Sequence, residues 1–153
     1  MTFHVVDPAS PVAVRALTAY VAELSARFVA IVPVEDVLTG AATDYVPPHG
    51  LFAVAGDEPY ACGAATFLDG ERGEVKRMWV APERRGQGVA TALLAYLEDA
   101  IRAAGRTVAV LDTSDLLTEA IALYERSGYV PTERYNDNPH ARLWFRKDLA
   151  TSS

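Results

Sequence analysis

The segment that most constrains the fold of this chain runs from residue 74 to residue 112. An apolar run, EVKRMWV, leads into the turn PERRGQG, and a second apolar run, TVAVLD, closes the segment. Between them, apolar side chains recur at steps of four from Val89 to Ile101, and Gly105 stands where such a helix would end. A strand, a helix and a strand in this order predict a βαβ unit, whose two strands run parallel with a right-handed crossover.

The residues before this segment predict a strand, a helix and two more strands. TFHVV is typical of a strand, and Ser10-Pro11 is typical of a helix start, here followed by an apolar stripe from Val14 to Phe28. Residues 32–50 contain three prolines and two glycines with little periodicity, so we expect a long loop that includes one helical turn. LFAVAG and YACGAATFL predict two strands that continue into EVKRMWV as antiparallel hairpins.

The residues after the βαβ unit predict one more helix and two strands. Residues 113–115 offer side-chain oxygens that could cap a helix, whose apolar face runs from Leu117 to Tyr124 and which Gly128 ends. YVPTERY and ARLWFRKDL predict the last two strands, joined by the turn-rich NDNPH. The complete order predicts an α+β fold with a mixed, mostly antiparallel sheet of about seven strands around one parallel unit.

Composition indicates one domain and limits its partners. A chain of 153 residues with 50% hydrophobic content can bury a core and enclose a site, so we assign residues 1–150 to a single domain and 151–153 to a disordered tail. The formal net charge of −6 argues against a nucleic-acid or anionic-membrane binder. It favours, weakly, a cationic or amine-bearing partner.

The cysteine and histidine content indicates the compartment and argues against a metal. The lone Cys62 excludes an internal disulfide and fits a reducing environment, and we expect it to be buried and inert. The start MTFHVVDPAS lacks the regions of a signal peptide, and no apolar run reaches the length of a membrane span, so we expect a cytoplasmic protein. His4, His49 and His140 have no metal-ligand spacing, so no metal site is expected.

The turn PERRGQG has the chemistry of an anion site. A helix N-terminus leaves main-chain N–H groups without partners and carries partial positive charge, and two glycines let an anion approach closely. A Walker loop would need Gly-Lys-Ser/Thr, and a dinucleotide fingerprint would need a third glycine where Thr91 stands, which disfavours ATP, GTP and NAD. The turn therefore predicts a phosphate or pyrophosphate site, the alternative being a glycine-rich connector with surface arginines.

These residues resemble the GNAT superfamily of N-acetyltransferases. Arg85-x-x-Gly88-x-Ala90 is similar to its Arg/Gln-x-x-Gly-x-Gly/Ala signature, and LDTS, AIALYERSGY and WFRKDL follow where that family has such segments. The resemblance extends from about Leu51 to Leu149. It implies a three-layer α/β/α arrangement in which the two parallel strands splay apart to admit acetyl-coenzyme A.

The resemblance also implies how that co-substrate is bound. The turn would hold the pyrophosphate, mainly through main-chain N–H groups, at Arg85, Gly86, Gln87, Gly88, Val89 and Ala90. The strand end would pair with the pantetheine arm like an added strand, at Met78, Trp79 and Val80. An N–H near Val80 would polarise the thioester carbonyl.

Two side chains are implied as catalytic. Tyr124 matches the position of a phenol that protonates the departing thiolate, although an aromatic residue at helical spacing is more commonly core. Glu74 matches a position where several members carry a general base, although glutamates at strand ends are also commonly solvated.

The acceptor is expected to meet the loops TDYVPPHG and YNDNPH. The candidates are Tyr45, His49, Lys76 and Asn138, together with Asp44, Tyr135 and Asp137. Each of them taken alone is more commonly structural, so the prediction rests on their grouping. Strand alternation predicts Glu74, Lys76 and Met78 on one face and Val75, Arg77 and Trp79 on the other, and a solvated Glu-Lys pair is the alternative for Lys76.

The function implied is direct acetyl transfer from acetyl-coenzyme A to an amine of a small molecule or peptide, in a ternary complex with no acyl-enzyme. The alternative is a module on the same fold that binds acetyl-coenzyme A without chemistry. Another acyl donor or an O-acyl acceptor also stays open. The sequence is compatible with a monomer or a homodimer.

Overall fold

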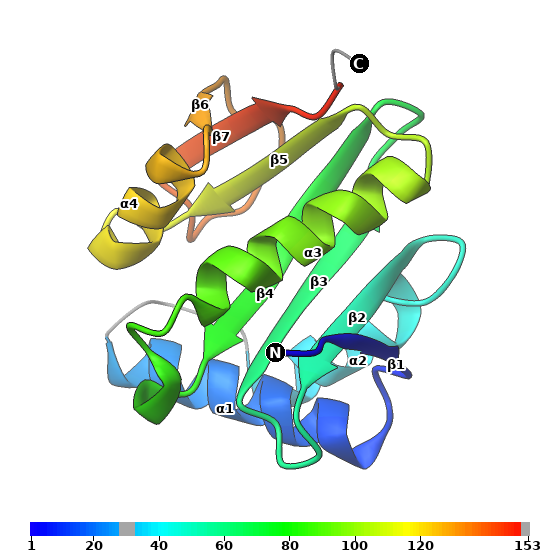
Figure 1. Cartoon of the computed structure of the whole chain (residues 1–153), viewed down its shortest axis with the longest axis vertical. Coiled ribbons are helices and arrows are strands. Elements are labelled where there is room, and N and C mark those ends of the chain that lie inside the picture. The colour runs from blue at the N-terminus through cyan, green and yellow to red at the C-terminus, as the bar shows by residue number, and fades with distance from the viewer. Residues whose placement is uncertain (28–32, 151–153) are drawn as a thin grey trace.

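The computed structural model describes residues 1–27 and 33–150, and these form one seven-stranded sheet (Figure 1). The strand order across the sheet is β1-β2-β3-β4-β5-β7-β6. The strands are β1 (His4–Val6), β2 (Gly50–Ala55), β3 (Ala61–Phe67), β4 (Arg72–Val80), β5 (Val108–Thr113), β6 (Val130–Pro131) and β7 (Leu143–Asp148). All neighbouring strands are antiparallel except β4 and β5, which confirms the predicted central parallel unit.

Helices cover both faces of this sheet (Figure 1). They are α1 (Pro11–Ala26), α2 (Val34–Asp44), α3 (Val89–Ala103) and α4 (Thr118–Arg126), with a short 3₁₀ turn at Pro82–Arg84. One buried core joins α3 and α4 to the sheet, and a second joins α1 and α2 to the opposite face. No helix in the described ranges has the length and apolarity to cross a membrane.

The prediction of a long loop over residues 32–50 is wrong, because residues Val34–Asp44 form α2. Val37 and Ala41 are four residues apart and both are buried, so one short apolar stripe is enough to anchor the helix. The prolines lie outside its interior, with Pro33 at the N-cap and the other two beyond its end. Residue 32 itself lies outside the described residues, as do Phe28 and the tail 151–153.

Two smaller predictions about the C-terminal third also need correction. Residues 113–115 do not cap α4: its N-cap is Leu117, without a side-chain cap, and Ser114 Oγ instead accepts a hydrogen bond from the Leu116 amide (3.1 Å). The strand expected at YVPTERY is reduced to β6, because the chain leaves the sheet after Pro131 and folds over the end of β5.

A β-bulge in β4 overturns the predicted alternation of its side chains. Cys62 pairs with Trp79 and Ala64 pairs with Lys76, so β4 holds one extra residue, and Arg77 adopts a left-handed φ of 59°. Beyond the bulge the faces are exchanged. Met78 packs in the α3 core, Trp79 packs in the α1–α2 core, and the Arg77 side chain reaches Tyr20 and Tyr45 on that same side.

Helix α3 packs so closely on β4 that a single methyl group should destabilise the protein. A Cβ at Gly73 would lie 2.7 Å from both Cγ1 and Cγ2 of Ile101, which are fixed branches rather than a flexible chain end. We expect Gly73→Ala to lower the free energy of unfolding by about 1–3 kcal/mol in urea denaturation.

The matched control is Gly40→Ala on α2, where nothing lies within 4 Å of the added Cβ. It should raise the free energy of unfolding by up to about 1 kcal/mol because alanine is the better helix former. Equal stability of the Gly73→Ala variant and the wild type would contradict this packing.

Candidate functional site

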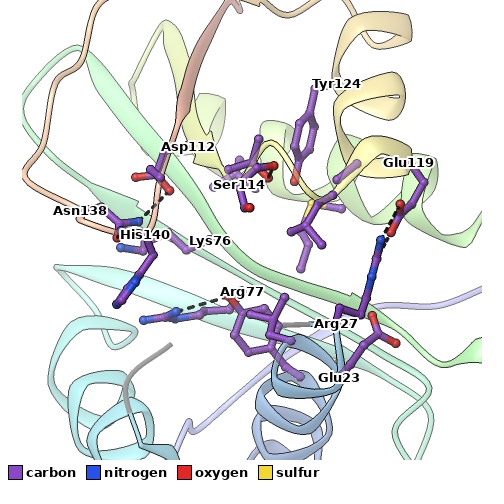
Figure 2. Close-up of a pocket in the computed structure, with 18 of the residues that line it drawn as sticks. Glu23, Arg27, Lys76, Arg77, Asp112, Ser114, Glu119, Tyr124, Asn138 and His140 are labelled. Atoms are coloured by element: carbon purple, nitrogen blue, oxygen red, sulfur yellow. Dashed lines mark hydrogen bonds and ion pairs between the residues drawn. The ribbon is translucent and has the colours of Figure 1, made fainter. Parts of the chain in front are cut away.

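The parallel strands β4 and β5 separate soon after they pair. Their register covers only Arg72–Glu74 against Val108–Val110, so the rest of β4 has no partner strand on that side among the described residues. A cleft of about 350 Å³ opens there between the two strands, α1 and α4 (Figure 2). Its lining includes Tyr20, Met78, Asp112, Ser114, Tyr124 and Asn138.

The turn before α3 is linked to this cleft through Arg85, which pairs with Glu23 of the cleft lining, and its amides have no partner among the described residues. Gly86 and Gly88 have φ angles of 76° and 80°, and nothing in the protein lies within 4 Å of where their Cβ atoms would be. In the described part of the chain, no oxygen accepts a hydrogen bond from the main-chain N–H of residues 86–91. Since α3 is a helix of 15 residues, these donors lie at the positive end of a full helix dipole.

Arg85 differs from the residues that follow it. Its own amide donates to the Pro82 carbonyl (3.3 Å), so the run of free amides begins at Gly86. Its guanidinium donates to the Val80 carbonyl (3.1 Å) and pairs with Glu23 of α1. The Arg85 side chain thus links the turn to α1 across the end of β4.

The ring of Tyr124 belongs to the core, and its hydroxyl faces the cleft. The ring packs against Tyr129 and Phe145, with centroids 6.0 and 6.3 Å away. The phenol points from α4 into the cleft (Figure 2). Burial raises the pKa of Tyr124 above its ordinary value, so the phenol stays protonated well into alkaline pH.

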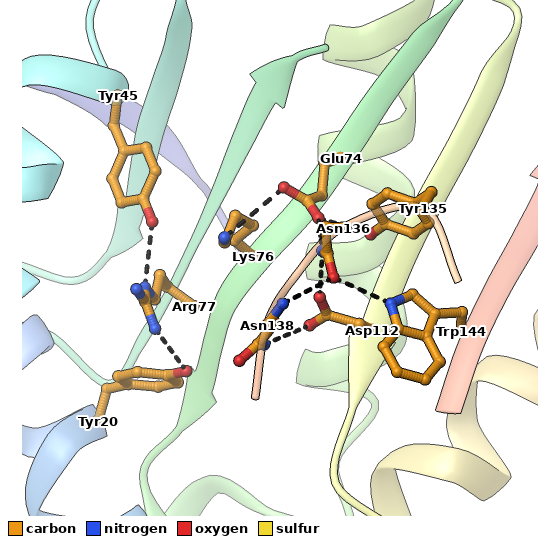
Figure 3. Close-up of polar contacts among 10 residues, drawn as sticks. All are labelled: Tyr20, Tyr45, Glu74, Lys76, Arg77, Asp112, Tyr135, Asn136, Asn138 and Trp144. Carbon is orange, nitrogen blue, oxygen red and sulfur yellow. Dashed lines mark hydrogen bonds and ion pairs between the residues drawn. The ribbon is translucent and has the colours of Figure 1, made fainter. Parts of the chain in front are cut away.

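Glu74 is not a solvated strand-end glutamate, since only 5% of it is exposed. Its Oε2 accepts hydrogen bonds from the Tyr135 hydroxyl (2.5 Å) and from Asn136 Nδ2 (3.2 Å), and its Oε1 lies 3.6 Å from Lys76 Nζ (Figure 3). The Glu-Lys pair that the sequence offered as an alternative is therefore present, but its carboxylate is buried rather than solvated. Burial, together with the neighbouring Glu74 carboxylate, raises the pKa of Tyr135, which keeps this donor protonated.

A second cleft of about 350 Å³ lies on the other side of Lys76 and Arg77, between α2, β3 and β4. It brings together four of the predicted acceptor residues, namely Asp44, Tyr45, His49 and Lys76, and it adds Glu74. Asn138 lines the first cleft instead. Asp137 lines neither cleft and lies 4.0 Å from Arg134 in an exposed pair.

Sequence reasoning missed Asp112 and Asn136, which connect the two clefts. Asn136 Nδ2 donates to Asp112 Oδ2 (2.6 Å) as well as to Glu74, and Trp144 Nε1 donates to Asn136 Oδ1 (3.0 Å) (Figure 3). Trp144 thus orients the Asn136 amide through this hydrogen bond. The available signal was the carboxylate that follows the apolar run of β5 together with the repeated amides of NDN.

Cys62 is fully buried, as predicted, and its Sγ lies 3.4 Å from the Arg77 carbonyl oxygen. Burial raises the pKa of its thiol far above the ordinary value, so no thiolate forms at neutral pH. Among the described residues, no three His, Cys, Asp or Glu side chains gather as a metal site would require.

Comparison with known proteins identifies the family. The sequence profile of the acetyltransferase (GNAT) family matches residues 17–129. The chain belongs to the GNAT family of acetyltransferases. Among curated relatives, an uncharacterised N-acetyltransferase from Schizosaccharomyces pombe is 36% identical over 110 residues, which are 69% of this chain and 68% of that protein. An IAA acetyltransferase from Azospirillum brasilense is 40% identical over 92 residues, which are 58% of this chain and 60% of that protein.

A solved structure supports the same GNAT fold. A GNAT family acetyltransferase from Elizabethkingia anophelis with acetyl-CoA bound superposes with a TM-score of 0.72, covers 97% of both chains and is 16% identical. The open, mixed seven-stranded sheet expected from the sequence is therefore confirmed as the fold of this GNAT protein.

Proposed function

We propose that this protein is an N-acetyltransferase that moves the acetyl group of acetyl-coenzyme A directly to an amine in a ternary complex. The observation that carries the proposal is the row of amides at residues 86–91, which have no partner in the described part of the chain. They lie at the start of α3, and Arg85 of the same turn pairs with Glu23 in the lining of the cleft between the diverging strands. Amides without partners at a helix N-terminus suit a diphosphate, and the adjoining cleft suits an extended thioester arm.

The co-substrate would be bound along this edge of the protein. Its diphosphate accepts hydrogen bonds from the amides of Gly86, Gln87, Gly88, Val89 and Ala90, while Arg85 contributes positive charge once released from Glu23. The pantetheine arm follows the free edge of β4 at Met78, Trp79 and Val80, as an added strand would. The bound acetyl-CoA of the Elizabethkingia anophelis protein, which has the same fold, supports this co-substrate.

The chemistry would use a base and an acid on opposite sides of the thioester. Glu74 takes a proton from the acceptor amine, directly or through water, as the nitrogen attacks the carbonyl carbon. The tetrahedral intermediate collapses, the carbon–sulfur bond breaks, and Tyr124 gives its proton to the departing thiolate. Because both reactants are held in one site, proximity supplies much of the rate. The acceptor lies among Tyr45, His49, Lys76 and Asn138.

Replacing the proposed base tests this arrangement. We expect Glu74→Gln to lower kcat/KM by about 100-fold near neutral pH, because the protonated amine then has no acceptor for its proton. The deficit should shrink as the pH rises, since more of the free amine is already deprotonated. Release of free thiol from acetyl-coenzyme A measures the rate from pH 6 to 10.

The matched control is Glu71→Gln, an exposed glutamate three positions before Glu74 that lines neither cleft. Its rate should match that of the wild type at every pH. A Glu74→Gln deficit that is the same at all pH values would contradict the role as base.

A panel of amines assayed by thiol release tests the function as a whole. Turnover with any amine supports the enzyme. Tight binding of acetyl-coenzyme A without release on any member of the panel would instead assign the chain to a binding module.

A further inference from the structure

Arg77 occupies the wall between the two clefts. It sits at the bulge of β4, and the bulge turns its side chain towards α1 and α2. Its Nε donates to the Tyr45 hydroxyl (3.1 Å) and its Nη1 donates to the Tyr20 hydroxyl (3.3 Å) (Figure 3). The guanidinium also lies over the Tyr20 ring, 5.6 Å from its centroid. These contacts fix the direction of a cation that lines both clefts.

Arg77 is unusual among the cations of the clefts because it has no carboxylate partner. Arg27 pairs with Glu119, and Lys76 Nζ lies 3.6 Å from Glu74. No Asp or Glu oxygen of the described chain lies within 4.0 Å of Arg77, and the remaining residues, 28–32 and 151–153, contain neither Asp nor Glu.

The two phenols do not neutralise Arg77. Burial raises the pKa of both Tyr20 and Tyr45 above the ordinary value, although Arg77 opposes the rise, so both hydroxyls are uncharged at neutral pH. Arg77 is thus a partly buried guanidinium held between neutral groups. Burying an unpaired charge raises the free energy of the protein, and an anionic group on a ligand would lower it again by pairing with the guanidinium.

We propose that Arg77 binds a carboxylate of the acceptor, which makes the acceptors amines that carry a carboxylate, such as amino acids. This inference rests on the proposed function and names its substrate class. Glu74 and Arg77 line the same second cleft, so an amine directed to Glu74 and a carboxylate directed to Arg77 fit one small molecule. Guanidinium and carboxylate also form the strongest planar ion pair available to side chains.

The other charges of the second cleft favour a zwitterion over a simple anion. Asp36, Asp44 and His49 lie on its exposed side, and Lys76 is paired with Glu74. The exposed carboxylates attract the ammonium group of an incoming amino acid, and water screens their repulsion of its carboxylate. Arg77, which is less exposed, provides the stronger local field.

The first experiment compares each of the twenty common L-amino acids with its carboxamide, using wild-type protein and thiol release from acetyl-coenzyme A. We expect at least one amino acid to exceed its carboxamide in kcat/KM by about 10- to 100-fold. Carboxamides that equal or exceed their acids throughout would overturn the inference while leaving the proposed function intact.

The second experiment tests Arg77 itself. Arg77→Asn suits the left-handed backbone and removes the charge, and it should raise KM for the preferred acid by about 10- to 100-fold while the carboxamide changes far less. Arg77→Lys keeps the positive charge and should retain part of the preference for the acid over its carboxamide. If the Arg77→Asn variant does not fold, Arg77→Lys is measured in its place. Arg146→Asn, an exposed arginine of β7, is the control. An unchanged preference in the Arg77→Asn variant would overturn the assignment.

Calorimetry separates this inference from the proposed function. Amino acids are titrated into wild-type protein saturated with coenzyme A, so no turnover is needed. Binding of an acid but not of its carboxamide supports the inference even if no thiol is ever released. Absence of binding by all twenty acids would refute it.

Discussion

Replacing Tyr124 with phenylalanine should lower kcat by about 10- to 100-fold and leave the Kd for coenzyme A within about twofold. The ring keeps its contacts with Tyr129 and Phe145, so the variant loses only the proton donor beside the cleft. Because burial raises the pKa of Tyr124, the wild type should keep this acid in working form at alkaline pH, and the deficit should persist there. Thiol release measures kcat and calorimetry measures Kd.

Tyr129→Phe is the matched control for this experiment. Tyr129 belongs to the same aromatic cluster, but its hydroxyl donates to Glu98 (2.9 Å) rather than facing the cleft. Its loss should lower stability by about 1 kcal/mol without changing kcat. Equal losses of turnover in both variants, or parallel losses of binding and turnover in Tyr124→Phe, would contradict the proposed acid.

Replacing Gly88 with valine should raise the Kd for coenzyme A by at least about 100-fold. Gly88 has a φ of 80°, which a β-branched residue adopts only with strain of about 1–3 kcal/mol. Its missing Cβ faces open space, where the diphosphate is proposed to approach, so a side chain would also block the ligand. Isothermal titration with coenzyme A measures the change.

Gly105→Val is the control that separates the effect of backbone strain from that of a side chain blocking coenzyme A. Gly105 follows the other end of α3, has a φ of 83°, and likewise has nothing within 4 Å of its missing Cβ. Both variants should lose similar stability in thermal unfolding, but only Gly88→Val should lose affinity for coenzyme A. If both variants bound coenzyme A with the same Kd, the turn at Gly88 would not be part of the binding site.

The parts of the fold that could be predicted are those where local sequence and tertiary packing agree. The helix from Val89 has a complete apolar stripe, and the apolar run before Thr113 is too short for a helix and is typical of a buried strand. The parallel βαβ unit could therefore be predicted from the sequence. In α2 the signal was weak, because two buried residues, Val37 and Ala41, sufficed once α1 covered them. Packing against α1, rather than the local sequence, stabilises α2.

Some residues of the candidate site could likewise be predicted from the sequence, and others could not. The phenol of Tyr124 and the glycines of the turn could be proposed as site residues from their positions in a motif, which the sequence displays. The bulge at Arg77 was hidden, because it depends on how β3 and β4 pair across 15 residues of chain. Asn136 was hidden too, since its role comes from bridging Glu74 and Asp112, which are far from it in sequence.

The amides of residues 86–90 are proposed to bind the diphosphate of coenzyme A. A titration of ¹⁵N-labelled protein with coenzyme A, followed by amide NMR, reports that contact residue by residue. We expect large, saturable shifts of the amides of residues 86–90, and no such shifts when pantetheine, which lacks the diphosphate, replaces coenzyme A. Binding of coenzyme A that leaves these amides unmoved while others shift would contradict it.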